Sequence, residues 1–233
     1  QTSIVYYDDG KTEIGRFQVQ NRVILTDDKI PEHLKDAVIA AEDRTFWTNK
    51  GISPRGIARA AWNNFNGGSL QGGSTLTQQY VKNVLLNTQD RTYKRKFKEF
   101  FIAVKVANDN ELGKAKILNA YLNTIYFGRN AYGVEAASQA YFRKPAAKLT
   151  VSESAFLAGI INGPELYDPQ DGEKSAAAAQ GRWSYVLDSM VETGKLSAEE
   201  RAALEVPKVK KVKARNSLAG HRGYLMRMVS DEL

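Results

Sequence analysis

Ala-Ala-Glu-Asp-Arg-Thr-Phe-Trp-Thr-Asn-Lys-Gly occupies residues 40–51 and sets two adjacent carboxylates, Glu42 and Asp43, at the end of an apolar run over residues 37–41. An arginine and two aromatic residues follow. A carboxyl group at such a helix end can be partly desolvated, which raises its pKa and makes it a competent base near neutral pH. A solvated helix end with an acidic pair is the simpler interpretation, so the choice depends on other segments.

The residues around this stretch indicate two kinds of secondary structure. Leu34, Ala37, Val38 and Ala41 recur at helical spacing behind Pro31, which predicts an amphipathic helix that delivers Glu42 at its end. In residues 1–30, β-branched and aromatic residues flank an Asp-Asp-Gly turn. This pattern predicts a β-hairpin.

Composition limits the chemistry that the chain can perform. Its 233 residues are 42% hydrophobic and 25% charged, which fits a globular chain with one sizeable core. The absence of cysteine excludes a disulfide framework and a thiol nucleophile, and two histidines far apart argue against a histidine triad or metal site. No apolar run reaches the length of about 18 residues that marks a membrane-spanning helix. Any catalysis therefore rests on carboxylates, hydroxyls, amides and cations.

The net charge of +7 is unevenly distributed. Basic side chains gather in residues 91–98 and again in residues 208–215. Such clusters attract phosphate groups of a diphosphate, of anionic lipid or of nucleic acid, and a solvated surface is the alternative.

A glycine-rich stretch over residues 67–79 runs into a predicted helix. It is no P-loop, because Gly73 stands where that motif requires lysine. Thr75-Leu-Thr-Gln78 has the form of a capping box, and free N–H groups at a helix start favour anions. Lys82 and Asn83 follow one turn later. A polar helix start after a linker is the alternative.

The rest of the chain reads as a series of helices. In the predicted helix over residues 91–107, the cations Arg95 and Lys96 lie one turn from Glu99 and are expected to lower its pKa. Periodicity predicts further helices over residues 114–126, 131–141, 150–161, 175–191 and 197–204.

Taken together, five segments resemble the five ordered motifs of the peptidoglycan glycosyltransferases, glycosyltransferase family 51. They are Glu42–Phe46, Gly72–Asn83, Arg95–Glu99, Lys114–Gly128 and Leu157–Pro164. The resemblance covers about residues 31–170, and five long motifs in order are specific. Departures are Asn49 for a usual histidine, Ser53 for a common aspartate and Asn119 for a frequent glutamate.

The resemblance implies a mainly α fold, with a lysozyme-like helical lobe, a small mobile membrane-contacting lobe and a short β-hairpin at the N-terminus. Residues 1–30 are expected to be linker strands, 31–206 the glycosyltransferase domain, and 207–233 a linker toward a transpeptidase domain, as in bifunctional class A penicillin-binding proteins. The expected location is the outer face of the cytoplasmic membrane, anchored by a transmembrane helix outside this chain. The apolar residues that fit the membrane-contacting lobe, or else an ordinary core, are Ile52, Ile57, Trp62, Phe65 and Leu70.

The implied reaction joins lipid II to a growing glycan chain through β-1,4 bonds, with inversion and release of undecaprenyl diphosphate. Glu42 is the expected base, and Glu99, the second catalytic residue, orients cations on the diphosphate. The expected substrate-binding residues are Asp43, Phe46, Asn49, Ser74, Thr75, Gln78, Gln79, Lys82, Asn83, Arg95, Lys96, Lys114, Asn123 and Tyr126. No organic cofactor and no nucleic acid is expected, and the metal ligands are unknown, with Asp43 a candidate to help hold a divalent ion such as Mg²⁺.

Two other classes remain. A lysozyme-like hydrolase or lytic transglycosylase also uses a glutamate at a helix end, but its leaving group is a sugar and needs no cluster of cations. A non-enzymatic binder of nucleic acid or membrane surfaces accounts for the charge but not for the two glutamates beside the glycine-rich loop.

Overall fold

The computed structural model describes residues 2–18, 23–53, 74–85, 102–108, 113–212, 225 and 228–229. It divides into two compact units. One comprises Arg22–Lys210, and the other comprises Gln1–Asn21 together with Lys211–Leu233.

The smaller unit contains the predicted hairpin. Strands β1 (Thr2–Tyr6) and β2 (Glu13–Gln18) pair antiparallel, with an irregularity in the register between Val5 and Tyr6. Asp9 closes the connection, because its Oδ1 accepts hydrogen bonds from the backbone N–H groups of Lys11 (2.9 Å) and Thr12 (2.8 Å). The prediction from the turn residues is confirmed.

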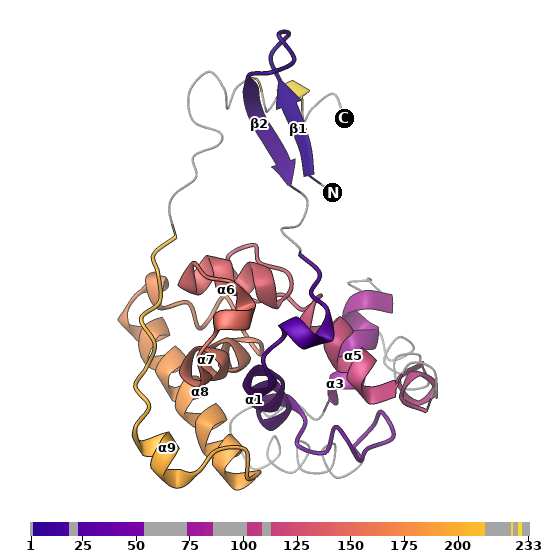
Figure 1. The fold of residues 1–233 in the computed structure, drawn as a ribbon, viewed down its shortest axis with the longest axis vertical. Coiled ribbons are helices and arrows are strands. Elements are labelled where there is room, and N and C mark those ends of the chain that lie inside the picture. Colours follow the sequence, from indigo (N-terminus) through magenta and orange to yellow (C-terminus); the bar gives the residue numbers. More distant parts are fainter. Residues whose placement is uncertain are drawn as a thin grey trace. The chain divides into compact units, whose positions relative to one another are not determined.

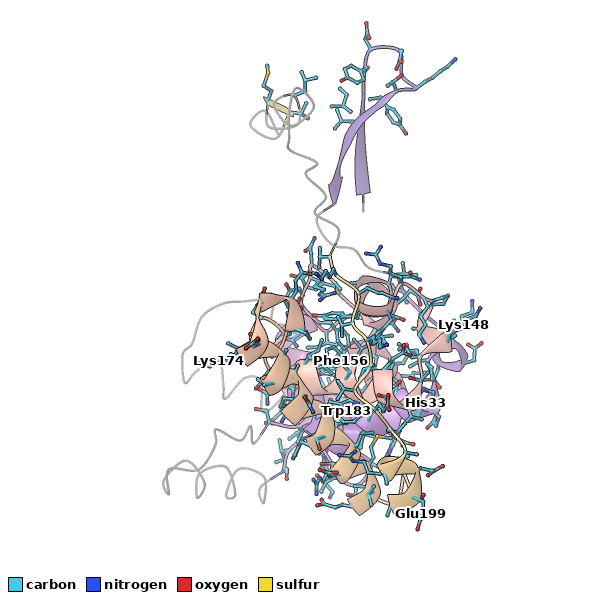
Figure 2. The ribbon with its side chains drawn as sticks, turned by 90° about the vertical axis from the view of Figure 1, so that its left-hand side faces the viewer. His33, Lys148, Phe156, Lys174, Trp183 and Glu199 are labelled. Atoms are coloured by element: carbon cyan, nitrogen blue, oxygen red, sulfur yellow. The ribbon has the colours of Figure 1, made fainter. Side chains whose placement is uncertain are left out.

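Three helices form the centre of the larger unit (Figure 1): α1 (Glu32–Glu42), α7 (Val151–Ile160) and α8 (Glu173–Glu192) pack against one another. α7 is buried along most of its length, which explains why its sequence is apolar on nearly every side. Gly159 lets α8 approach closely, since a Cβ there would lie 3.2 Å from the carbonyl carbon of Arg182. Figure 2 shows Phe156 of α7 and Trp183 of α8 within this core, while Lys148, Lys174 and Glu199 lie at the periphery.

Helix α1 has the predicted extent. Pro31 occupies the N-cap position without a side-chain capping hydrogen bond, and Leu34, Ala37 and Val38 are fully buried on one face. The helix ends at Glu42, because Asp43 leaves helical geometry while its N–H still donates to the Ile39 carbonyl at 2.9 Å. The sequence therefore placed Glu42 correctly at a helix end.

The remaining elements lie around this centre. They are the 3₁₀ turns η1 (Asp27–Lys29), η3 (Ala146–Lys148) and η4 (Pro169–Asp171), the π-helical turn η2 (Val81–Leu85), and the α-helices α3 (Leu76–Tyr80), α5 (Gly113–Leu122), α6 (Val134–Phe142) and α9 (Ala198–Ala202). Residues 102–107 are also helical. Helices α3, α7 and α9 start at capping boxes, at Thr75, Thr150 and Ser197, of which the one at Thr75 was predicted.

Two predicted helix boundaries are wrong for one physical reason. α5 ends at Leu122 instead of continuing to Tyr126, and α6 begins at Val134 instead of residue 131. The chain between them folds back on itself through a β-bridge between Tyr126 and Tyr132, with Gly133 at a φ of 82°. Paired backbone groups and left-handed residues in this reversal exclude a helical path.

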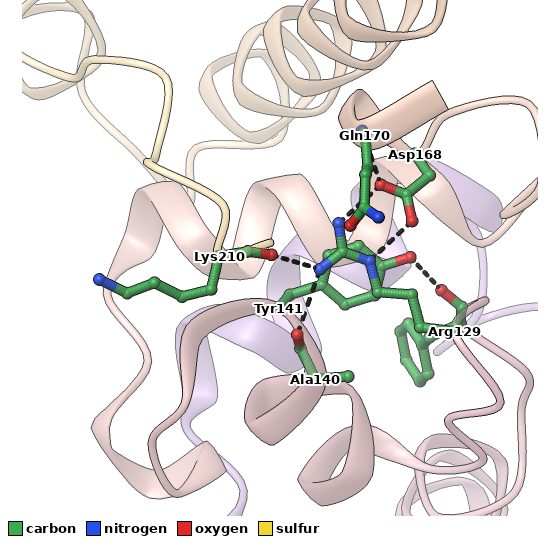
Figure 3. Close-up of polar contacts among 7 residues, drawn as sticks. Arg129, Ala140, Tyr141, Asp168, Gln170 and Lys210 are labelled. Atoms are coloured by element: carbon green, nitrogen blue, oxygen red, sulfur yellow. Dashed lines mark hydrogen bonds and ion pairs between the residues drawn. The ribbon is translucent and has the colours of Figure 1, made fainter. Parts of the chain in front are cut away.

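A buried arginine fixes the point where the chain leaves the larger unit (Figure 3). Arg129 donates to both carboxylate oxygens of Asp168, at 2.7 and 2.6 Å, and to the carbonyls of Ala140 and Lys210. Its guanidinium lies 4.1 Å from the ring centroid of Tyr141, and the Lys210 N–H donates to the Tyr141 carbonyl. The Arg129 guanidinium thus joins the connection between α5 and α6, the loop after α7 and the segment at Lys210.

The mainly α class is confirmed. Residues 54–73 lie outside the described part, so a membrane-contacting lobe and the predicted domain boundaries stay predictions. In the part of the chain that the structure describes, no helix is long and apolar enough to span a bilayer.

Candidate active site

Glu42 presents one held and one unpaired carboxylate oxygen. Its Oε2 accepts a hydrogen bond from Gln79 Nε2 at 2.7 Å. Its Oε1 is buried and has no hydrogen-bond partner in the described part of the chain. Burial raises the pKa of Glu42, and Asp43 adds to this, while the Gln79 hydrogen bond and the charge of Arg182 oppose it. The structure therefore supplies the desolvated carboxyl that the sequence pattern predicted.

A hydrogen-bonded chain leads from Glu42 into the interior. Gln79 lies on α3, and its Oε1 accepts a 2.8 Å hydrogen bond from the hydroxyl of Tyr121 on α5. Tyr121 is fully buried. Burial, with a further contribution from Glu42, raises the pKa of Tyr121 well above its usual range, so its hydroxyl stays protonated and remains a donor.

Asp43, the next residue, has a different environment. Both of its carboxylate oxygens accept from Asn49 Nδ2, at 3.0 and 2.9 Å, and it also accepts from Thr45 Oγ1 and from the N–H of Leu76 at the start of α3. Asp43 is buried and ties the turn after α1 to α3.

Lys114 extends this network. Its ammonium donates to Asn49 Oδ1 at 3.0 Å and lies 4.8 Å from the ring centroid of Phe46. Burial lowers the pKa of Lys114, and the charge of Asp43 opposes that effect. Phe46 is fully buried and packs against Lys114 and the core, and its expected role in substrate binding stays a prediction.

The predicted capping box at α3 is confirmed. Thr75 accepts from the Gln78 N–H while Gln78 Oε1 accepts from the Thr75 N–H, and Thr75 Oγ1 also donates to the Gly51 carbonyl at 2.6 Å. The expectation of free N–H groups at this helix start is wrong for Leu76 and Gln78, since both already donate within the protein. Thr75 and Gln78 are buried, which makes them supports of the site.

The other predicted residues fall into three groups. Ser74 is half-buried beside Thr75, and Lys82 and Asn83 are exposed on η2. Asn123 is buried, where its amide bonds both backbone groups of Leu25, and Tyr126 donates to Glu165 at 2.7 Å. The predicted residues outside the described ranges are Arg95, Lys96 and Glu99, along with the expected lobe residues Ile57, Trp62, Phe65 and Leu70.

The described residues around Asp43 do not supply a complete set of protein ligands for Mg²⁺. Its oxygens already accept from Asn49, Thr45 and Leu76, and the described residues contain no group of three His, Cys, Asp or Glu side chains that could hold a metal ion. Hard divalent ions need several oxygen ligands converging on one point.

Two residues near Glu42 escaped the sequence reasoning. Tyr121 lies in the predicted helix over residues 114–126 but was given no role at the site, and Arg182 belongs to α8, more than a hundred residues from Glu42 in sequence. Arg182 is anchored by a hydrogen bond from its Nε to the Gly159 carbonyl at 3.1 Å. Only the packing of α8 beside α1 brings it near, and no local pattern carries that information.

Comparison with known proteins identifies the family. A family model described as "Transglycosylase" matches residues 10–191. The chain belongs to the transglycosylase family. This agrees with the glycosyltransferase resemblance of the five motifs.

Curated relatives of this transglycosylase chain carry the name penicillin-binding protein 1A. The protein of Mycobacterium tuberculosis is 46% identical over 241 residues, which cover 100% of this chain and 29% of the relative. That of Aquifex aeolicus is 43% identical over 201 residues, covering 86% of this chain and 27% of the relative. The chain thus spans less than a third of the length of these relatives.

A solved structure shares the fold. The crystal structure of penicillin-binding protein 1A from Haemophilus influenzae aligns with a TM-score of 0.53 and 24% identity, over 100% of this chain and 24% of that one. At this identity the likeness supports the transglycosylase fold alone.

Proposed function

We propose that this chain is a peptidoglycan glycosyltransferase that polymerises lipid II into β-1,4-linked glycan strands with inversion. The observation that carries the proposal is the Glu42 carboxyl, which is partly buried, raised in pKa and held by one donor while its buried other oxygen is unpaired in the described part of the chain. Membership of the transglycosylase family supports glycosyl transfer as the reaction in which this base acts.

In the proposed reaction, the 4-hydroxyl of the acceptor N-acetylglucosamine attacks C1 of the N-acetylmuramic acid at the reducing end of the growing chain. Glu42 takes the hydroxyl proton as the new C1–O bond forms, and the bond from C1 to the diphosphate oxygen breaks. A raised pKa suits this task, because a general base works best when its pKa is near the working pH.

The leaving diphosphate needs positive charge and no proton donor. By the family resemblance, Arg95, Lys96 and Lys82 supply that charge and Glu99 orients them. Of these, Lys82 is described, and it lies exposed on η2, directly after the helix that carries Gln79. The proposal assigns no step to a metal ion, and a divalent ion near Asp43 stays a prediction.

The alternative, a lysozyme-like hydrolase or lytic transglycosylase that cleaves peptidoglycan, is not favoured by the family match. Its base or acid would also be a glutamate at a helix end. What separates the two classes is the leaving group, a sugar in one and a diphosphate in the other.

The setting of the reaction is part of the proposal. By analogy with relatives named penicillin-binding protein 1A, we place the chain at the outer face of the cytoplasmic membrane, in a longer protein with a membrane anchor and a transpeptidase domain. Lipid II and the growing glycan are the proposed partners, together with the membrane surface that presents them.

The test incubates the chain separately with lipid II and with purified cell wall, and measures polymer in the first case and released fragments in the second. Wild type should form polymer, and Glu42→Gln should lower the rate by about 10²-fold or more, because the amide keeps the shape but cannot act as a base. Glu199→Gln, at an exposed glutamate on α9, is the matched control. Fragments from cell wall without polymer, or Glu42→Gln activity within about tenfold of wild type, would contradict the proposal.

A further inference from the structure

We infer that Tyr121 is a positioning residue for the Glu42 carboxylate and acts through the side-chain amide of Gln79. The relay holds Oε2 and leaves Oε1 as the oxygen that receives the substrate proton. The catalytic meaning of this inference rests on the proposed function, whereas the relay itself can be tested without any substrate.

The relay fixes the orientation of an amide that has two possible faces. An ionised carboxylate oxygen can only accept, so the Gln79 side chain must turn its Nε2 toward Glu42 Oε2, as the 2.7 Å contact requires. Gln79 Oε1 then faces the other way and needs a donor. The Tyr121 hydroxyl meets it at 2.8 Å and donates. Without that donor, turning the Gln79 amide over so that its oxygen faces Glu42 would break one hydrogen bond fewer.

Packing makes Tyr121 a rigid donor. It is fully buried on α5, Gln79 lies on α3, and Glu42 ends α1, so three separate helices set the positions of the three groups. α3 and α5 pack directly against each other. A hydroxyl that stays protonated in a fixed place costs no reorganisation when the proton moves, which is the condition for effective preorganisation.

The unpaired oxygen gives the relay a function. Glu42 Oε1 is buried and accepts nothing from the described residues, although buried polar atoms in folded proteins nearly always have partners. An atom reserved for a substrate hydroxyl has this property. The charged groups that act on Glu42 are Asp43, beside it in the chain, and Arg182 from α8; Tyr121 faces it from α5 in neutral form.

The first experiment compares the full chain with Tyr121→Phe. Removing the hydroxyl should lower kcat by about two- to tenfold, the value of one ordinary hydrogen bond, and leave KM for lipid II within about twofold. The ascending limb of the pH–rate profile should move to higher pH. The reason is that a loosened Gln79 stabilises the ionised Glu42 less, so the pKa of Glu42 rises further.

Tyr141→Phe is the matched control. Tyr141 is also fully buried, and its hydroxyl donates to the Phe127 carbonyl at 2.8 Å in a network that does not include Glu42. This variant should lose stability in urea unfolding as Tyr121→Phe does, with an unchanged pH profile. An equal displacement of the ascending limb in both variants would overturn the inference.

The second experiment tests whether Tyr121 acts through Gln79. Gln79→Met removes the donor to Glu42 at similar size, so it should displace the ascending limb more than Tyr121→Phe does. In the Gln79→Met background, adding Tyr121→Phe should have no further effect on kcat or on the pH profile, because the intermediary is gone. Full additivity of the two changes would refute the relay.

The third measurement separates this inference from the proposed function. Carboxyl ¹³C NMR of glutamate-labelled chain, with the Glu42 signal assigned by its loss in Glu42→Gln, reports the Glu42 pKa without substrate. The pKa should rise from wild type to Tyr121→Phe and again to Gln79→Met. Unchanged titration in both variants would overturn the relay even if the chain polymerises lipid II, while a chain that makes no polymer but shows the shifts would refute only the function.

Discussion

Replacing Arg129 by methionine should destabilise the larger unit severely. The Arg129 side chain is 4% exposed and that of Asp168 12%, so the change leaves a carboxylate buried without its cation. Removing one partner of a buried ion pair costs about 3–5 kcal/mol of unfolding free energy. For a chain of this size that corresponds to a fall in Tm of about 6–20 °C.

The assay is urea unfolding at several pH values, followed by circular dichroism. Burial alone would raise the pKa of Asp168, but hydrogen bonds from Arg129 and from the Gln170 N–H, with the charge of Arg129, hold it below the usual range. A depressed folded pKa stabilises the fold above the unfolded value near pH 4, and this contribution is lost as the pH falls through the folded pKa. The difference in unfolding free energy between wild type and Arg129→Met should therefore be largest at neutral pH and should decrease below about pH 4.

Asp188→Asn provides the comparison. Asp188 accepts from Arg201 at 2.8 Å, but its side chain is 59% exposed, so breaking this pair should cost about 0–1 kcal/mol. If Arg129→Met costs no more than Asp188→Asn, or if its deficit is as large at pH 3 as at pH 7, burial is not what makes the Arg129 pair important.

Two further predictions concern the backbone and the membrane. Gly133→Ala should lower the free energy of unfolding by at least about 1–2 kcal/mol, because Gly133 has a φ of 82° and a Cβ there would lie 2.5 Å from the Asn123 carbonyl oxygen. A Cβ at Gly181 within α8 would meet nothing within 4 Å, so Gly181→Ala should raise the free energy of unfolding by about 0.5–1 kcal/mol. Equal effects of the two changes in thermal unfolding would contradict both predictions. The chain should sediment with anionic vesicles at low salt and less as salt rises, through the basic residues in 208–215 and 91–98, and equal binding to neutral vesicles would show that charge is not the cause.

The sequence was most informative where one residue determines a local structure. The spacing of Leu34, Ala37 and Val38 was enough to end α1 at Glu42, and Thr75 with Gln78 was enough to start α3, because capping and amphipathic packing are local rules. The mainly α class was implied by the resemblance to the glycosyltransferases, and the helical periodicity agrees with it.

Roles that depend on long-range packing were beyond this reasoning. Phe46 and Asn123 belong to motifs of the resemblance, yet burial turns the first into a support for Lys114 and the second into a tie to Leu25. Tyr121, in contrast, gains a role at the site that the sequence did not indicate. It matched the pattern of a core aromatic, and only the approach of α3 to α5 gives its hydroxyl a partner at the site.

Packing gives the two adjacent carboxylates, Glu42 and Asp43, different environments that the local sequence pattern does not distinguish. Asp43 accepts from Asn49, Thr45 and the Leu76 N–H, so its carboxylate is held inside the protein by hydrogen bonds. Glu42 has one donor and a buried oxygen with none in the described part of the chain. Since Asp43 also holds the start of α3, it fixes the helix that carries Gln79 to Glu42. One carboxylate thus builds the frame in which the other can accept a proton.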